Sequence, residues 1–233
     1  MSRRFRPTDA FVDESIRGQR YLMACVLVQA HDMPAMRSDM GTLAGTKSTR
    51  VHFNAELDSR RQVLLERFAT FTMESLVVVC RRGHGITEFE ARTRCLAYIV
   101  GMLQLRSVDR LVIESRQDDV DDERTIHRHR QRAPRLVFEH RRGVDEPLLW
   151  IADGVAWTLA ILANGAQHGE RHRQRRIGRL PCGRCLGEIG TGHDRNRGAA
   201  GDISQRLQSP GRKYCLDVGL AGSFLASPPL IVD

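Results

Sequence analysis

An aspartate inside an apolar segment is the most informative residue of this sequence. Asp153 stands in the segment 148–157, LLWIADGVAW, which would be apolar on nearly every side as a helix. A helix of that kind is buried, and a buried carboxylate without a partner is costly or changes its protonation state. Asp153 therefore needs a partner, and the sequence leaves this open between a metal ion, an arginine and hydrogen-bond donors.

Further acids stand where predicted strands end. Asp13 and Glu14 close the segment AFVDE, and Glu114 closes LVIE. Because side chains alternate along a strand, Asp13 and Glu14 point to opposite faces of it. Glu56, which follows VHFNA, is a weaker candidate of the same kind. Acids at such places also serve turns and solvation, so none of these residues predicts a site alone.

Taken together, the acids supply a mechanism. Two divalent ions about 4 Å apart can clamp the attacking and leaving oxygens of a phosphodiester. Mg²⁺ and similar hard ions prefer carboxylate oxygens as ligands. The set Asp13, Glu14, Glu114 and Asp153 offers the three or four carboxylates that such a site requires.

The elements that must position these acids alternate between strand and helix patterns. Buried apolar runs predict strands, and helical spacing of apolar residues predicts helices. The alternation favours an α/β fold, and an opening β-hairpin makes its sheet mixed. The predicted strands are 10–13, 21–29, 49–53, 76–80, 110–114 and 135–139, with a turn at 16–19; the predicted helices are 31–45, 58–68 with Asp58 as N-cap, 88–105, 120–132 and 147–163.

Charge and hydropathy exclude some classes of protein. The 233 residues carry 36 basic and 28 acidic side chains, a net charge of +8. Only two basic residues are lysines, a bias typical of genome base composition, so the excess alone does not predict nucleic-acid binding. No stretch is apolar enough to span a membrane, and the charged start of the chain is unlike a secretory signal. We expect a cytoplasmic protein.

The segment 164–233 is rich in arginine and glycine and shows no lasting helical or alternating pattern. We expect an irregular basic tail, either a flexible extension or the product of an altered reading frame. Its arginines would contact phosphates without sequence preference. Cys182 and Cys185 form a CxxC that would bind zinc only with further ligands, so free thiols are favoured. The arginines that would contact nucleic acid are Arg171, Arg173, Arg175 and Arg176.

Two other polar groups are expected at the surface. The acidic run 118–123 indicates a solvated loop and helix N-terminus, where negative charge is favoured. His140 could transfer protons near neutral pH, but an exposed histidine is the favoured interpretation. Cys25, Cys80 and Cys95 lie in apolar runs and are predicted to be reduced core residues.

Several of these motifs together resemble one family. The segments FVDES, HFNAE, LVIES and LWIADGVA resemble the opening strand, an intermediate segment, the central strand and a late helix of the domain-of-unknown-function 3800 family. The resemblance covers about 8–163, and the chain departs from the family after Ala163. That family is similar to ribonuclease-H-like folds.

The resemblance implies a fold and a set of ligands. It implies a ribonuclease-H-like α/β domain over 1–163, with a mixed sheet flanked by helices. It also implies Mg²⁺ or Mn²⁺ held by Asp13 of the first strand, Glu114 of the central strand and Asp153 of the late helix, with Glu14 and Glu56 as auxiliary ligands. These three main ligands are the predicted catalytic residues.

The sequence therefore predicts a metal-dependent nuclease that hydrolyses DNA or RNA. The alternative is a non-catalytic module that binds nucleic acid or another protein through its basic tail, with Asp153 in an internal salt bridge. Convergence of Asp13, Glu114 and Asp153 would favour the enzyme. An arginine on Asp153, with the acids apart, would favour the module.

Overall fold

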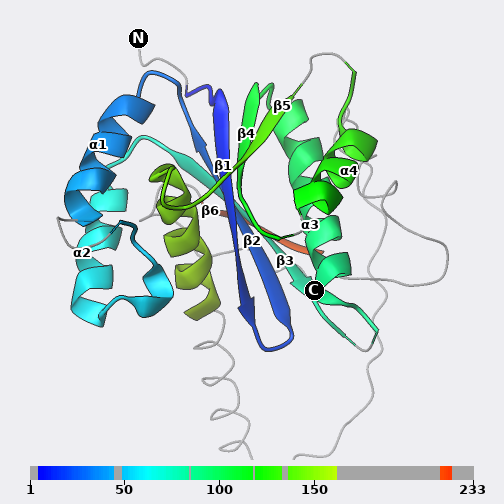
Figure 1. Cartoon of the computed structure of the whole chain (residues 1–233), viewed down its shortest axis with the longest axis horizontal. Coiled ribbons are helices and arrows are strands. Elements are labelled where there is room, and N and C mark those ends of the chain that lie inside the picture. Colours follow the sequence, from blue (N-terminus) through cyan, green and yellow to red (C-terminus); the bar gives the residue numbers. More distant parts are fainter. Residues whose placement is uncertain are drawn as a thin grey trace, which may run out of the picture. The chain divides into compact units, whose positions relative to one another are not determined.

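A mixed sheet of six strands forms the centre of the fold (Figure 1). The computed structural model describes residues 5–44, 49–83, 85–117, 119–132 and 136–161, and the backbone of 216–221. The strand order is β5-β4-β1-β2-β3-β6. The strands are β1 (Asp9–Arg17), β2 (Arg20–Val28), β3 (Glu74–Arg81), β4 (Arg110–Glu114), β5 (Val137–Arg141) and β6 (Leu216–Ala221).

The directions of the strands divide the sheet into two parts. The strands β1, β2, β3 and β6 pair antiparallel, whereas β4 pairs parallel with β1 and β5 pairs parallel with β4. A two-residue turn at Gly18 and Gln19 joins β1 to β2. Gly18 has a φ of +57°, which glycine adopts without steric cost. The predicted hairpin is confirmed, with a tighter turn and a longer first strand than the sequence indicated.

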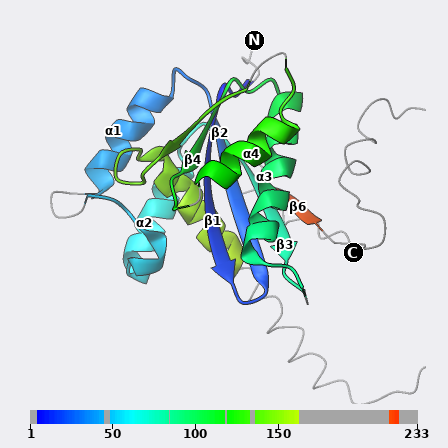
Figure 2. The same ribbon diagram turned by 45° about the vertical axis from the view of Figure 1, so that its right-hand side comes forward.

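Helices cover both faces of the sheet (Figures 1 and 2). One face packs against α1 (Met33–Ala44), α2 (Asp58–Phe68) and a last helix whose described part is 148–161. The opposite face packs against α3 (Glu88–Leu105) and α4 (Asp119–His129). The last helix carries no label in Figure 1 and is drawn in yellow-green beside β1.

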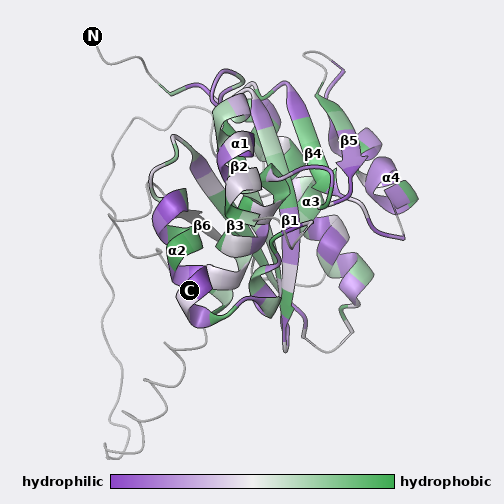
Figure 3. Cartoon of the chain, turned by 60° about the vertical axis from the view of Figure 1, so that its left-hand side comes forward, coloured by the Kyte–Doolittle hydropathy of each residue, from purple (hydrophilic) through white to green (hydrophobic). Residues whose placement is uncertain are grey.

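The alternation of side chains along the central strands builds two apolar cores. Phe11 of β1 and Ala24 of β2 are buried on the face of the last helix. Val12 and Cys25 are buried on the face of α3. Apolar segments concentrate along the sheet and on the inner sides of the helices, and polar residues lie outside (Figure 3). The predicted fold class, α/β with a mixed sheet flanked by helices, is confirmed.

Two local predictions are corrected. The segment 49–53 is not a strand; it leads into a 3-10 turn, Phe53–Ala55. Val51 and Phe53 are buried there because they pack on the core of the last helix, so their alternation arises without strand pairing. Asp58 is the first residue of α2, whereas Leu57 holds the N-cap position.

The predicted irregular tail is described only in part. Most of 164–233 lies outside the described residues. The exception is β6, which pairs antiparallel with β3 and adds a sixth strand to the sheet. The sequence showed only moderate apolarity at this place. Among the described helices, none is both long and apolar enough to cross a bilayer.

Candidate functional site

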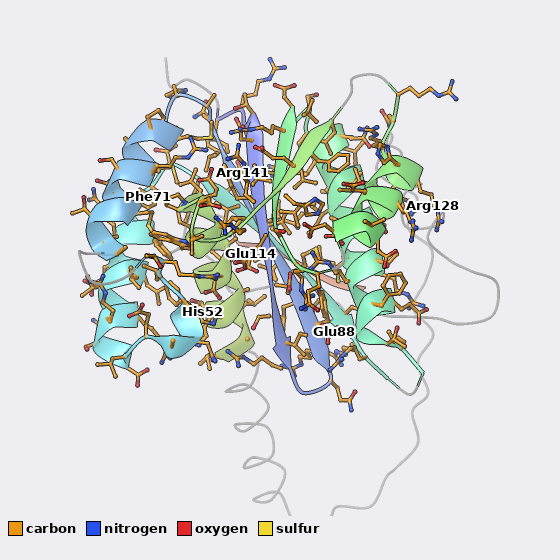
Figure 4. The ribbon with its side chains drawn as sticks, in the orientation of Figure 1. His52, Phe71, Glu88, Glu114, Arg128 and Arg141 are labelled. Atoms are coloured by element: carbon orange, nitrogen blue, oxygen red, sulfur yellow. The ribbon has the colours of Figure 1, made fainter. Side chains whose placement is uncertain are left out.

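The three acids predicted to be catalytic come from three elements and meet on one face of the sheet. The parallel register of β1 and β4 runs up to the pair Val12 and Ile113, so Asp13 and Glu114 are the next residues on two adjacent strands. Phe11 and Val112, two residues earlier on each strand, face the core of the last helix, and side chains alternate. Asp153 is buried on that same helix. Figure 4 labels Glu114 near β1 and this helix.

Asp13 carries the clearest electrostatic sign of this convergence. Its side chain is buried, and burial is the largest cause that raises the pKa of its carboxyl group well above the usual value. The charges of Glu114, Glu14 and Asp153 and a hydrogen bond with Glu114 raise it further. The amide N–H of Glu14 donates to Asp13 Oδ1 at 2.7 Å. The carboxyl groups of Asp13 and Glu114 are therefore in contact, and their like charges favour a shared proton or a bound cation.

Asp153 is oriented by two donors of one short segment. The His52 ring nitrogen Nδ1 donates to Asp153 Oδ2 at 3.0 Å, and the Phe53 amide donates to the same oxygen at 2.9 Å. The His52 side chain is half exposed (Figure 4). The partners found for this buried carboxylate are thus hydrogen-bond donors, rather than the arginine that the binding-module interpretation required.

Glu114 is held by a guanidinium and covered by a glycine. Arg50 Nη1 lies 2.9 Å from Glu114 Oε1. A Cβ atom on Gly143 would lie 2.6 Å from that same oxygen and 2.9 Å from Arg50 Cζ. Gly143 is anchored in turn, because its carbonyl accepts a hydrogen bond from the Trp150 indole N–H. The loop between β5 and the last helix therefore fits closely over the pair only without a side chain at 143.

The two predicted auxiliary ligands are not brought into this group. Glu14 faces the opposite side of the sheet, where Arg92 and Arg116 bind it. Burial raises the pKa of Glu14 by more than those two arginines lower it. The alternation of side chains along β1, which the sequence already predicted, places Glu14 away from the group, and the structure gives no support to its prediction as an auxiliary ligand. Glu56 follows the 3-10 turn and is partly exposed.

A second polar group lies beneath α4, and the sequence did not predict it. One ligand atom each of Asp119, Asp122 and His140 lie within 4.8 Å of one another, the spacing of a candidate metal cluster. The His140 side chain is only 10% exposed, and Asp122 is buried. Asp122 and His140 are therefore not the surface residues that were expected.

The carboxylates of this second group are occupied by protein donors. Asp122 accepts from Arg92 Nε at 2.8 Å and Arg92 Nη2 at 2.6 Å, one bond to each oxygen. Asp119 accepts from the Ser115 hydroxyl at 2.6 Å and the Arg116 amide at 2.8 Å, again one bond to each oxygen. Burial raises the pKa of Asp122, but hydrogen bonds from His140 and Arg92 outweigh it and lower the pKa overall. The group forms a network that fixes α4 to the sheet.

Several predicted residues cannot be compared with the structure. Arg171, Arg173, Arg175, Arg176, Cys182 and Cys185 lie outside the described residues. Cys25, Cys80 and Cys95, which are described, are buried free thiols as predicted.

Two solved structures of Bst-RNase HIII resemble this chain. One is of a mutant protein, with 12% identity and a TM-score of 0.43, and the other is a complex with Mn²⁺, with 11% identity and a TM-score of 0.45. Each match covers 67% of this chain and 52% of the other, so the chain spans about half the length of these structures. No family model matches the chain, and no curated protein sequence matches it.

The fold is of the ribonuclease-H-like α/β class. The strand order and directions carry this assignment: an antiparallel β1-β2-β3 meander, followed by β4 and β5 parallel to β1 on the other side. The candidate site lies where β1 and β4 of that sheet meet the last helix.

Proposed function

We propose that this chain is a metal-dependent nuclease that hydrolyses phosphodiesters of DNA or RNA. The observation that carries the proposal is the group formed by Asp13, Glu114 and Asp153. Carboxylates buried together repel one another. A divalent cation between them would relieve this repulsion, so the arrangement suits a cation site better than a purely structural one.

The donor set fits Mg²⁺ or Mn²⁺. Carboxylate oxygens are the ligands that hard divalent ions prefer. Among the residues that the structure describes, only Asp119, Asp122 and His140 place three ligand atoms within 4.8 Å of one another. Asp13, Glu114 and Asp153 together offer several carboxylate oxygens, enough to contribute ligands to two ions about 4 Å apart.

Each group of the chain has a part in this proposal. When bound, the ions would lower the pKa of water and stabilise the charge that develops on the phosphate. Asp13 and Glu114, on adjacent rigid strands, would hold the ions at a fixed separation. Asp153 would add a carboxylate from the last helix, and the bonds from His52 and the Phe53 amide would keep it in one orientation.

Three more specific properties are proposed together with this function: the family, the substrate and the location. Membership of the domain-of-unknown-function 3800 family is supported by the four motifs in the sequence. Nucleic acid as the substrate is supported by the group of carboxylates, which suits ion-assisted hydrolysis of a phosphodiester; the net charge of +8 would add only a non-specific attraction for polyanions. A cytoplasmic location is the third proposal, and the reduced thiols of Cys25, Cys80 and Cys95 support it.

A nuclease assay on the full chain tests the proposal. We expect cleavage of labelled DNA or RNA with Mg²⁺ or Mn²⁺ and none with EDTA. Asp153→Asn keeps the size of the side chain and should lose at least about 100-fold in rate, the upper end of what removal of a ligand-supporting group costs. Asp145→Asn is a matched control, because Asp145 forms a surface pair with Arg142. Full activity in Asp153→Asn, or activity in EDTA, would refute the proposal.

A further inference from the structure

We propose that Arg50 is a phosphate-binding residue that occupies the ion position at Glu114 until a divalent ion displaces it. The inference rests on the proposed function and goes beyond it by assigning a substrate contact. It starts from one contact, in which Arg50 Nη1 lies 2.9 Å from Glu114 Oε1. Glu114 is in turn hydrogen-bonded to Asp13. A guanidinium therefore sits directly on the group of acids.

The contact belongs to a short segment that binds two of the three acids. Arg50 reaches Glu114, while His52 and the Phe53 amide reach Asp153. Val51 and Phe53 are buried in the core and fix the backbone of this segment. The arginine is thus placed at the site by its neighbours in sequence, not by a chance meeting of surface side chains.

The guanidinium and a divalent ion cannot share the oxygen of Glu114 on equal terms. Both are cations, and their mutual repulsion acts in a partly buried place where water screens weakly. The Glu114 side chain is 16% exposed. The loop at Gly143 leaves no space beside the pair, because even a Cβ atom there would clash with both partners. Ion binding should therefore move the guanidinium away from Glu114.

A guanidinium displaced from Glu114 could bind the substrate. The Arg50 side chain is 31% exposed, so it can turn towards solvent without leaving the site. The planar fork of arginine matches a phosphate oxygen pair and binds it with two hydrogen bonds. A phosphodiester bound to ions at Asp13, Glu114 and Asp153 would lie close to Arg50, because the Arg50 guanidinium is in contact with Glu114.

The closing experiment measures ion binding and nucleic-acid binding separately. Mn²⁺ binding to the full chain is followed by calorimetry, and binding of a fluorescein-labelled DNA duplex and an RNA–DNA hybrid by anisotropy. The variants are Arg50→Gln and Arg50→Lys, the second of which keeps the charge but loses the fork. Arg124→Gln is the matched control, because Arg124 forms an exposed pair with Asp121 on α4. Thermal melts confirm that each variant is folded.

The proposal predicts opposite effects on the two ligands. Arg50→Gln should bind Mn²⁺ about fivefold more tightly, as expected for loss of a competing ion pair of ordinary strength. With Mn²⁺ present it should bind nucleic acid about tenfold more weakly, and Arg50→Lys should fall between it and the wild type. Arg124→Gln should match the wild type in both measurements.

Other outcomes distinguish a failure of the role of Arg50 from a failure of the proposed nuclease function. Unchanged or weaker Mn²⁺ binding in Arg50→Gln, with normal binding by the wild type, would overturn the role of Arg50 and leave the proposed function standing. Unchanged nucleic-acid affinity in Arg50→Gln would overturn the phosphate contact. Mn²⁺ binding that is absent from the wild type, or that persists in Asp153→Asn, would overturn the proposed function and this inference with it.

Discussion

Alanine at Gly143 should damage the candidate site although it adds only a methyl group. The new Cβ atom would lie 2.6 Å from Glu114 Oε1, about 0.8 Å closer than the 3.4 Å at which ordinary contact begins. It would also lie 2.9 Å from Arg50 Cζ and Nη1. The glycine φ is not in the left-handed region, so the clash, rather than backbone strain, is the perturbation.

The magnitude follows from the size of this clash. Overpacking of a well-fitted place costs about 1–3 kcal/mol, and we expect a loss of stability near the lower end because the Arg50 side chain can move. A displacement of Glu114 by nearly 1 Å should have a larger effect on chemistry. Misplacement of that size costs roughly 100-fold in rate, so Gly143→Ala should lose nuclease activity while remaining folded.

The assay compares Gly143→Ala with Gly101→Ala. Gly101 lies in α3, and a Cβ there meets nothing within 4 Å. Alanine at Gly101 should leave activity unchanged and add up to about 1 kcal/mol of stability, since alanine is the better helix former. Urea melts and cleavage rates are measured for both variants with Mn²⁺. Wild-type cleavage by a folded Gly143→Ala protein would refute the placement of Glu114 in the site.

Three further perturbations have defined outcomes. Asp13→Asn should raise the melting temperature of the metal-free protein at neutral pH. The pKa of Asp13 is raised in the folded state, so the wild type loses stability as the pH rises from the unfolded pKa through the folded one. A melting temperature that does not rise in Asp13→Asn, in melts at several pH values, would contradict this. Gly154→Ala should lower the free energy of unfolding by at least about 1–3 kcal/mol, because its Cβ would lie 2.6 Å from Phe53 Cε2. An unchanged midpoint in urea would exclude this close packing of Gly154 against Phe53. Arg92→Met should lower the free energy of unfolding by about 3–5 kcal/mol, since it takes the guanidinium from the buried Asp122 and leaves Glu14 with Arg116 alone. A smaller loss in calorimetric melts would show that the network relaxes.

The predicted site acids came from a conflict within the sequence. Asp153 is a carboxylate inside an apolar run. Because a buried carboxylate needs a metal ion, an arginine or hydrogen-bond donors, its residue type alone marks a site that must be compensated. Glu114 and Asp13 end apolar runs of the buried-strand kind, so their placement followed from the strands. The structure brings Asp13, Glu114 and Asp153 together because β1 and β4 are adjacent and the last helix lies on the same face.

The remaining features depend on contacts between distant segments. Asp122 stands in a run of acids that indicates a solvated surface. Its burial depends on two residues distant in sequence, Arg92 of α3 and His140 of β5. The strand predicted at 49–53 is wrong although its buried and exposed residues do alternate. The buried residues Val51 and Phe53 pack on a helix and not within a sheet. Helix α3 and strand β4 had the predicted bounds, since their apolar patterns are long or strongly bounded.

The decisive experiment locates Mn²⁺ in crystals of the full chain by its anomalous scattering. We expect one or two Mn²⁺ peaks between the carboxylates of Asp13, Glu114 and Asp153, with the Arg50 guanidinium turned away from Glu114. We also expect no peak at Asp119, Asp122 and His140, because protein donors already occupy those carboxylate oxygens. A peak at this second group alone, or none at the first group at saturating Mn²⁺, would contradict the account.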